Sequence, residues 1–282
     1  MKEGPDIMKL TMLGTGHAIV RDCYNTCFVL HECGQYFLVD GGGGIGILRQ
    51  LRNAGINWKD IKHIFVTHKH MDHITGVLWM IRVICEYMQM GQYDGQVTIY
   101  AHSELLQSMK EICMMLLQEN EKEFLGHRIL FVELSDGDEF TIVGRRTTFF
   151  DIQSKKTKQF GFSMLLDRKN KLTCCGDEPC HPCERKYAWG STWLLHEAFC
   201  LSSQADYYQP YQHSHSTVQS ACQTADLLKV KNLILYHTED DNLEHRKSLY
   251  TKEGSQYFGG KLYVPDDLET IELSPELLTV QS

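Results

Sequence analysis

Residues 67–73 read T-H-K-H-M-D-H, and the rest of the chain is best understood outward from this stretch. It holds the imidazoles of His68, His70 and His73 together with the carboxylate of Asp72. Buried side chains of this polarity need partners, and a divalent cation supplies partners for all four at once. The stretch therefore predicts a metal site rather than a chance cluster of surface histidines.

The residues on either side place this motif between two elements of secondary structure. Residues 61–66 read as a buried strand, and residues 74–88 are apolar enough for a helix. Side chains on a strand-to-helix loop converge on a cleft. His68 and His70 point the same way on extended chain, so we expect them to bind one metal, whereas Asp72 and His73 are expected to reach a second.

Length, composition and charge are those of an ordinary soluble protein. The chain has 282 residues, of which 43% are hydrophobic and 23% charged, which is enough for a sizeable core. The net charge of −8 argues against a nonspecific nucleic-acid binder held by a basic face. Met1–Pro5 lacks the apolar stretch of a secretory signal, and the longest apolar run, residues 77–85, is broken by Arg82 and too short to span a bilayer. We expect a cytoplasmic protein with no membrane segment.

The sequence has 11 cysteines, an odd number that fits reduced thiols better than a disulfide framework. Cys174, Cys175, Cys180 and Cys183 cluster, with His181 between the last two. A Cys-x-x-Cys pair can hold a structural zinc, but the two pairs are too close together for the usual two-knuckle spacing. Because cysteine is commonly buried, we expect these four to be core residues.

Strands and helices alternate along the whole chain. Strands are expected at residues 9–13, 27–30, 36–39, 97–101, 129–133, 139–143, 147–152, 161–166, 171–174, 192–196 and 232–236, and further helices at 47–54, 103–119 and 216–228. Two successive strand-then-helix series favour two packed sheets with helices outside over a single doubly wound sheet. The absence of a low-complexity linker predicts one domain.

Four glycines, residues 41–44, follow Asp40 at the end of a predicted strand. They leave room for backbone to approach the metal cleft closely. A phosphate-cradling loop is the rival interpretation, but the lysine and the serine or threonine of a P-loop are missing.

Taken together, these residues resemble a known superfamily. The motif at 67–73, with Asp40 before it, resembles the metallo-β-lactamase fold. Other motifs are similar to the ribonuclease Z branch, in order along nearly the whole chain: L-G-T-G at 13–16, G-D at 176–177, H-E-A-F at 196–199, H-S-T at 215–217, L-Y-H-T at 235–238 and F-G-G-K-L-Y-V-P-D-D-L at 258–268. The resemblance implies an α/β fold with a single domain over residues 1–282, a four-layer αβ/βα sandwich of two mixed sheets with helices outside.

The resemblance also implies two divalent metal ions, zinc in the first place, at the junction of the sheets. One ion would be bound by His68, His70 and a bridging Asp177. The other would be bound by Asp72, His73, the same Asp177 and His237. Asp177 and His237 both follow predicted strands, which places them at strand ends facing the cleft.

One ligand of the family is missing from this chain. The family supplies a further histidine to the first metal, from the loop ahead of a Gly-aromatic pair, which here is Gly161-Phe162. We read Gln153 as the matching position, with Asp151 as the alternative, since both point the same way on an extended strand. A glutamine carbonyl is a weaker donor than imidazole, so the first site is expected to bind zinc less tightly, with manganese and iron as alternatives.

The implied chemistry is hydrolysis of a phosphodiester. Two metals that share a carboxylate lower the pKa of a bridging water, and the resulting hydroxide attacks phosphorus. In the family, the leaving oxygen is protonated by the histidine of the H-S-T motif, oriented by the glutamate of the H-E-A motif. The resemblance therefore implies His215 and Glu197, together with Asp72, as catalytic residues. His213 is a rival for the acid, and a helix-start network is the rival role for the pair.

The substrate is expected to be a phosphodiester, with RNA as one candidate, and the assembly a homodimer. The long basic arm with which the family processes transfer RNA has no room between Gln153 and Asp177, where only K-K-T-K at 155–158 links two strands. Two other functions stay open. One is a thioester or lactone hydrolase of the same fold, which would not need His215 and Glu197. The other is a non-catalytic metal- or nucleotide-binding protein.

Overall fold

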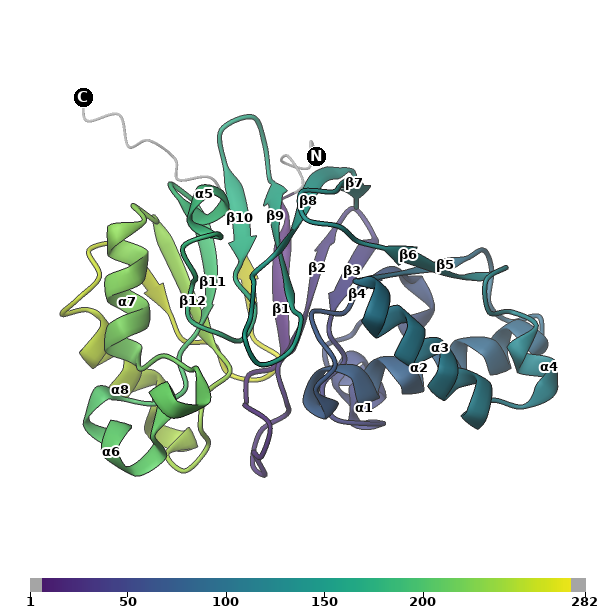
Figure 1. Cartoon of the computed structure of the whole chain (residues 1–282), viewed down its shortest axis with the longest axis horizontal. Helices are drawn as coiled ribbons and strands as arrows, with labels where there is room; N and C mark the ends of the chain where they lie inside the picture. The colour runs from purple at the N-terminus through teal and green to yellow at the C-terminus, as the bar shows by residue number, and fades with distance from the viewer. Residues whose placement is uncertain (1–6, 275–282) are drawn as a thin grey trace, which may run out of the picture.

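The computed structural model describes residues 7–274, so Met1–Pro5, considered above for a secretory signal, lies outside the described residues. Two sheets of seven strands pack face to face (Figure 1). The first has the order β14 (Thr270–Glu272), β1 (Lys9–Gly14), β2 (Cys27–Glu32), β3 (Gln35–Val39), β4 (Ile61–Phe65), β5 (Val97–Ala101), β6 (Ile129–Glu133). The second has the order β13 (Lys261–Tyr263), β12 (Asn232–Tyr236), β11 (Trp193–Glu197), β10 (Lys171–Cys174), β9 (Phe160–Leu165), β8 (Arg145–Asp151), β7 (Glu139–Ile142).

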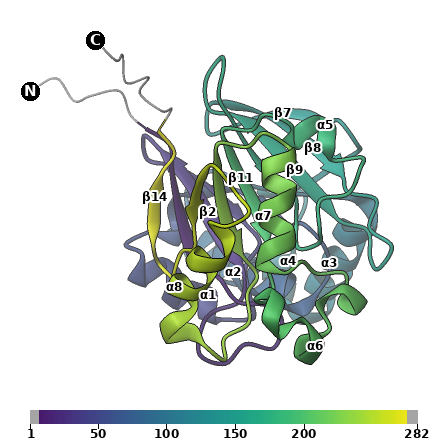
Figure 2. The same ribbon diagram turned by 90° about the vertical axis from the view of Figure 1, so that its left-hand side faces the viewer.

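Helices form the two outer layers. The first sheet is covered by α1 (Gly46–Asn53), α2 (Met71–Gln89), α3 (Ser103–Leu116) and α4 (Glu119–Lys122). The second sheet carries α5 (Arg185–Ala188), α6 (Ala205–Tyr208), α7 (Val218–Leu227) and α8 (Leu243–Gly254). Figure 2 shows α7 and α8 in front of this sheet. These four layers confirm the predicted fold class.

The hydrophobic core is built on strands whose two faces are both buried. Along β2, Phe28 and Leu30 pack between the sheets, whereas Cys27 and Val29 pack under the helices of the first sheet. This alternation is the period of two expected of a strand. Aromatic rings fill the space between the sheets, where Phe162 makes an edge-on contact with a ring of the facing sheet, Phe37, with centroids 5.7 Å apart. Such pairs stabilise beyond the area that they bury.

The two sheets share one pairing pattern. In each, three antiparallel pairs are followed by three parallel pairs, and the parallel run starts at β3 in the first sheet and at β10 in the second. Parallel neighbours present their carboxyl ends at the same edge of a sheet. The loops after β3 and β4 and those after β10, β11 and β12 therefore gather at one end of the sandwich.

Several helix boundaries differ from those expected. The helix expected at 103–119 ends at Leu116, because Leu117 is extended (φ −79°, ψ 151°) and a separate short helix follows. The helix expected from residue 74 begins at Met71, which brings Asp72 into its first turn. Helix α8 was not expected, since it is mostly polar and, beside the glycine at its end, buries only Arg246 and Tyr250.

The glycines after Asp40 bring their loop against the backbone of helix α2, including that of His73. The amide of Gly41 donates to the carbonyl of His73 (2.8 Å), and the amide of Gly76 donates to the carbonyl of Gly42 (2.9 Å). A Cβ on Gly76 would lie 1.8 Å from the carbonyl oxygen of Gly41. The first turns of α2 are thus held directly against the loop that follows β3.

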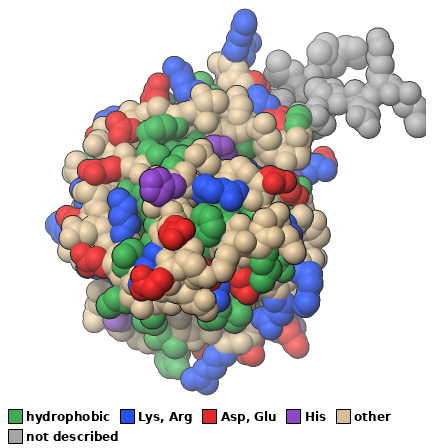
Figure 3. Space-filling model, turned by 90° about the vertical axis from the view of Figure 1, so that its right-hand side faces the viewer, with side chains coloured by type: hydrophobic (Ala, Val, Ile, Leu, Met, Phe, Trp, Pro, Cys, Tyr) green, Lys and Arg blue, Asp and Glu red, His purple; other side chains and the backbone are tan. Residues whose placement is uncertain are grey.

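Charged side chains of both signs are mixed on one face of the molecule. On the face shown in Figure 3, acidic and basic side chains are interspersed with hydrophobic ones, without a continuous basic surface. Within residues 7–274, no helix combines the length and apolar character that crossing a bilayer requires.

Gly76→Ala tests the close approach of α2 to the glycine loop. Alanine usually stabilises a helix interior by about 1 kcal/mol relative to glycine. Here we expect the opposite, a loss of about 1–3 kcal/mol in the free energy of unfolding, because the methyl group meets backbone. Chemical denaturation measures it, with Gly259→Ala as the control, since a Cβ there meets nothing closer than 3.7 Å. A Gly76→Ala protein more stable than the wild type would contradict this packing.

Candidate metal centre and active-site cleft

The structure gathers six predicted ligands into two clusters at the carboxyl ends of the parallel strands. Their ligand atoms lie within 4.8 Å of one another in each cluster, and the groups are His68, His70 and Asp177, and Asp72, His73 and His237. The four ligands from the motif at 67–73 follow β4. Asp177 follows β10, and His237 follows β12. This grouping is the one that the resemblance implies.

Asp177 faces both clusters at once. Its Oδ2 lies 3.3 Å from His68 Nε2, 3.6 Å from His73 Nε2 and 3.7 Å from His237 Nε2. Asp72 approaches only the second cluster, with its Oδ2 3.3 Å from His73 Nε2 and 3.7 Å from His237 Nε2. A single carboxylate between two groups of imidazoles is the arrangement that a bridging ligand requires.

Residues behind the clusters fix the orientation of the imidazoles. Asp40 Oδ2 lies 2.7 Å from His73 Nδ1, which turns His73 Nε2 toward the other ligands. Asp40 is in turn held by Thr67, whose backbone amide and hydroxyl both donate to it at 2.8 Å. The hydroxyl of Thr67 also lies 2.9 Å from His68 Nδ1. Carboxylate–histidine pairs of this kind commonly set the ring orientation of metal ligands.

The buried nitrogens of the clusters fit a metal. His73 Nε2 and both ring nitrogens of His237 are buried and make no hydrogen bond. His68 Nε2 lies 2.8 Å from His70 Nδ1, so two ring nitrogens converge on one point. Imidazole and carboxylate donors suit zinc and other divalent transition metals, and such ions would satisfy these atoms.

Charge in the clusters is balanced between carboxylates and imidazoles. Burial raises the pKa of Asp72, but His73 and His237 outweigh it and hold the pKa below its usual range. Burial likewise opposes ionisation of Asp177, and His68 reverses the effect, so its pKa is also lowered. Burial and the neighbouring His68 lower the pKa of His70 to about 4, which keeps its ring neutral near pH 7. Ionised carboxylates and neutral imidazoles are the forms that bind metal.

His73 differs from the other imidazoles. Burial lowers its pKa, but the carboxylates of Asp40 and Asp72 on either side raise it well above the usual value. The surroundings of His73 therefore favour positive charge, which a bound cation would also supply.

The structure does not support Gln153 as the replacement for the missing histidine. Its side chain is exposed, its φ is 57°, and its backbone amide donates to Asp151 Oδ1 at 2.7 Å. The buried side chain of Gln159, not that of Gln153, reaches the first cluster, with Nε2 2.5 Å from Asp177 Oδ1 and 3.2 Å from His68 Nδ1. After β8 the chain leaves the sheet in a loop. The loop is closed by a hydrogen bond from the amide of Ile152 to the carbonyl of Gln159, just before β9. The sequence signal for this residue was a glutamine between Lys158 and the apolar start of β9.

His215 and Glu197 meet at the wall of the same cleft. Glu197, at the end of β11, is fully buried, and its Oε1 accepts a hydrogen bond from the amide of Ser216 (2.6 Å). Its Oε2 lies 3.6 Å from His215 Nδ1. Burial lowers the pKa of His215, but Glu197 outweighs it, so the pKa is raised. The structure therefore contains both a histidine–carboxylate contact and a hydrogen bond at the start of α7, which Thr217 caps.

The two clusters open into a cleft of about 510 Å³. His70, Asp72, Asp177, His237 and His215 line its floor and wall. Residues to which the sequence assigned no role complete the lining, among them His17, Phe199, Tyr208 and Lys156. The ring of His17 packs against that of Phe199, with centroids 4.5 Å apart. His17 directly follows the L-G-T-G motif and Phe199 closes the H-E-A-F motif, so both lay next to recognisable segments.

Comparison with known proteins identifies the relatives of this chain. A family model described as Anti-Pycsar protein Apyc1 matches residues 8–258. Ribonuclease Z of Methanothermobacter thermautotrophicus is 24% identical, over 95% of this chain and 97% of the relative. Among solved structures, the metallo-β-lactamase fold protein YhfI from Bacillus subtilis has a TM-score of 0.77 at 15% identity, covering 95% of this chain and 100% of that one. Human tRNase Z, short form, has a TM-score of 0.69 at 21% identity, with the same coverage. These likenesses confirm the metallo-β-lactamase fold and the similarity to ribonuclease Z.

Metal content tests the bridging position of Asp177. Relative to the wild type, we expect Asp177→Asn to lose two equivalents of metal and His237→Ala to lose one, because only Asp177 faces both clusters. Elemental analysis of the purified proteins measures the difference. Gln153→Ala is the matched control, and we expect it to keep the wild-type content because its side chain is exposed. Retention of the full content by Asp177→Asn would contradict the assignment.

Proposed function

The chain belongs to the family described as Anti-Pycsar protein Apyc1, and we propose that it is a metal-dependent phosphodiesterase with zinc as the first candidate metal. The observation that carries the proposal is the carboxylate of Asp177 between two imidazole clusters, 3.3 Å from His68 and 3.7 Å from His237. The relatives named ribonuclease Z support it, since they share the fold and most of the chain length.

The metal ligands and the residues around them have separate tasks. Divalent ions held by the two clusters would supply Lewis-acid stabilisation and an activated water. The first site is proposed to be the weaker, because Gln159 contributes an amide where the family has a histidine, and manganese or iron remain alternatives there. Asp72 and Asp177 keep their negative charge, which offsets that of the cations. Gln159 fixes the orientation of Asp177 through its hydrogen bond.

His215 is proposed to donate a proton to the leaving oxygen. Its ring lines the cleft, 12% of its side chain is exposed, and Glu197 outweighs burial and raises the pKa of His215, which favours its protonated form. A histidine with these properties is suited to general acid catalysis. His213 also lines the cleft, but its side chain is exposed, and the carboxylate of Glu197 lies beside His215. The pair favours a phosphodiesterase over a thioester or lactone hydrolase.

The loop at 152–159 places a lysine where it could contact the substrate. It connects β8 and β9 directly and brings Lys156 to the rim of the cleft, where its ammonium donates to the carbonyl of His213. A cation at this position suits a phosphate oxygen. We propose a phosphodiester substrate, with RNA as the candidate that the ribonuclease Z relatives suggest. A cytoplasmic location is proposed on the cysteine count.

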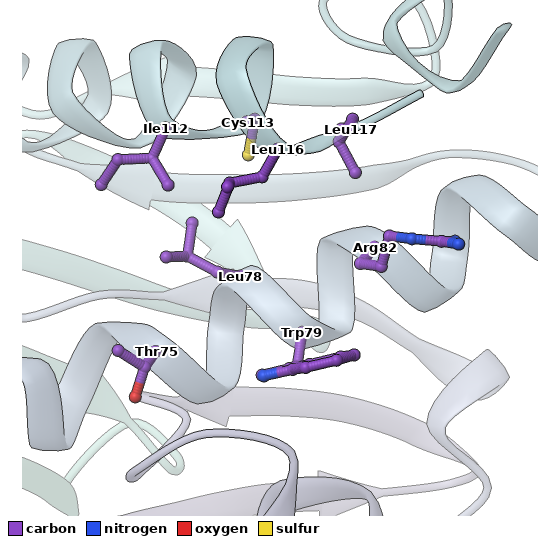
Figure 4. Close-up of a pocket in the computed structure, with 8 residues that line it drawn as sticks. All are labelled: Thr75, Leu78, Trp79, Arg82, Ile112, Cys113, Leu116 and Leu117. Carbon is purple, nitrogen blue, oxygen red and sulfur yellow. The ribbon is translucent and has the colours of Figure 1, made fainter. Parts of the chain in front are cut away.

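The homodimer expected from the sequence has a suitable surface between α2 and α3. A groove of about 340 Å³ lies there, and Figure 4 shows Leu78 of α2 pointing toward Leu116 of α3. Trp79, Met115 and Leu116 are 42%, 75% and 72% exposed. A two-fold dimer buries the same patch of both copies, so one apolar surface is sufficient.

Leu116→Glu tests this surface. We expect a wild-type dimer in sedimentation velocity and a shift toward monomer in the variant, because a buried unpaired carboxylate opposes association. Leu227→Glu is the control, since Leu227 is equally exposed (69%) but lies on α7. A wild-type monomer, or a dimer that Leu116→Glu leaves intact, would contradict the proposal.

The leaving-group dependence of turnover tests the role of His215. We expect His215→Ala to slow hydrolysis of a dinucleotide by about 10²–10⁴-fold, because an alkoxide needs a proton in order to leave. The loss should be much smaller on bis-p-nitrophenyl phosphate, whose leaving group departs without a proton. Steady-state rates on both substrates measure the contrast.

Two variants complete this test. Glu197→Gln should show the same leaving-group dependence in milder form, whereas His213→Ala should show none. Metal content of His215→Ala should stay at the wild-type level. Equal losses on both substrates would mean that His215 positions the substrate or supports the fold.

A further inference from the structure

The four clustered cysteines separate into different environments in the fold. Cys174 is a buried core residue, and its sulfur lies 3.6 Å from the hydroxyl of Tyr236. Cys183 is half-buried and donates to the carbonyl of Ile152 (3.2 Å). The remaining two, Cys175 and Cys180, face each other and the carboxylate of Glu184. The pair that converges is thus not the Cys-x-x-Cys pair of the sequence.

We propose that Cys175, Cys180 and Glu184 bind a further zinc ion, behind the catalytic cleft. One ligand atom of each lies within 4.8 Å of the other two. Thiolates are the ligands that zinc prefers at structural sites, and a carboxylate oxygen can complete such a set. In a tetrahedral zinc site the ligand atoms are roughly 3.5–3.8 Å apart, so a movement of about 1 Å closes the site.

Glu184 provides the independent observation that points to a cation. Its side chain is fully buried, and Oε2 accepts a hydrogen bond from the amide of His181 (2.5 Å). Its Oε1 is buried without an N–H or O–H donor and faces the two thiols. Burial is the main reason that the pKa of Glu184 is raised well above its usual value, and Cys180 adds to the shift. As thiolates and a carboxylate, the three groups would be costly to bury without a counter-charge, and a divalent cation would supply that charge.

The surroundings allow an ion to enter and stay. Cys175 and Glu184 are fully buried, whereas Cys180 is partly exposed, so one ligand of the proposed site lies next to solvent. The amide of Cys180 donates to His196 Nε2 (3.2 Å), which fixes the backbone at this ligand. His196 uses its other nitrogen on the carbonyl of Glu197 (2.7 Å), so it is a supporting residue and not a ligand.

The proposed ion would brace the segment that carries the bridging carboxylate. Cys175 and Cys180 lie on either side of Asp177, and no helix or strand is formed between Cys174 and Arg185. Glu178, next to Asp177, already ties this segment to the neighbouring loop by accepting from Ser154 (2.6 Å). We therefore assign the ion a structural role, and the assignment does not depend on the reaction catalysed.

Cobalt substitution tests the proposal directly. The full chain is stripped of metal with a chelator and reconstituted with Co²⁺. Thiolate-to-cobalt charge transfer absorbs in the near ultraviolet, and the predicted catalytic ligands include no cysteine, so the band reports on cysteine-bound metal alone. We expect the band in the wild type, and its absence would overturn the proposal. An intact mass lower by two hydrogens, indicating a Cys175–Cys180 disulfide, would also overturn it.

Three variants locate the ion. We expect Cys180→Ser to lose the band and one equivalent of zinc, and Glu184→Gln to weaken zinc binding by at least the roughly 10–100-fold that loss of an outer-shell partner costs. Cys183→Ser, in the same segment, is the matched control and should keep both the band and the zinc. Survival of the band in Cys180→Ser, or its loss in Cys183→Ser alone, would overturn the choice of ligands.

Discussion

Two buried carboxylates, Asp72 and Asp177, both approach His73 and His237, and the arrangement of the centre depends on how their charges are balanced. Like charges at this depth repel, and burial alone would protonate them. The imidazoles of His68, His73 and His237 prevent this, as the lowered pKa values of both carboxylates show. The arrangement leaves ring nitrogens of His73 and His237 buried without hydrogen bonds, and cations at the proposed sites would satisfy them. The same contacts between imidazoles and carboxylates therefore set the charge of the centre and underlie its proposed chemistry.

The repeated sheet pattern explains why residues so distant in sequence meet there. Each sheet changes from antiparallel to parallel pairing at its central strand, β3 or β10, and the loops after these strands and their parallel neighbours reach the junction. Asp40 follows the first of these strands and Asp177 the second. One orients an imidazole and the other faces both clusters. Ligands of α/β proteins commonly lie at the carboxyl ends of strands, and here two such edges are joined.

Much of this could be predicted from the sequence, because the strongest signals are local. The motif at 67–73 has its ligands within a few positions, and strands such as β5 and β10 have the bounds expected from their apolar residues. Gln153 was wrong for a physical reason. The prediction assumed that the strand continues through Gln153, so that Asp151 and Gln153 share a face. Instead, the chain turns through a left-handed conformation at Gln153 and rejoins the sheet at Gln159. The glutamine just before β9 was the one trace of that excursion in the sequence.

The two halves of the centre are positioned by different means. On the side of Asp40, backbone packs directly on backbone, since Gly41 and Gly76 leave no space for a side chain, and the ligands of α2 inherit their position from that contact. The segment around Asp177 forms no helix or strand, so side chains must hold it. Gln159 and Glu178 do so through hydrogen bonds, and the thiols with Glu184 supply the third point of attachment if they share an ion. A bridging ligand needs a fixed position relative to both clusters, and this second half of the centre reaches it through side-chain contacts rather than through regular secondary structure.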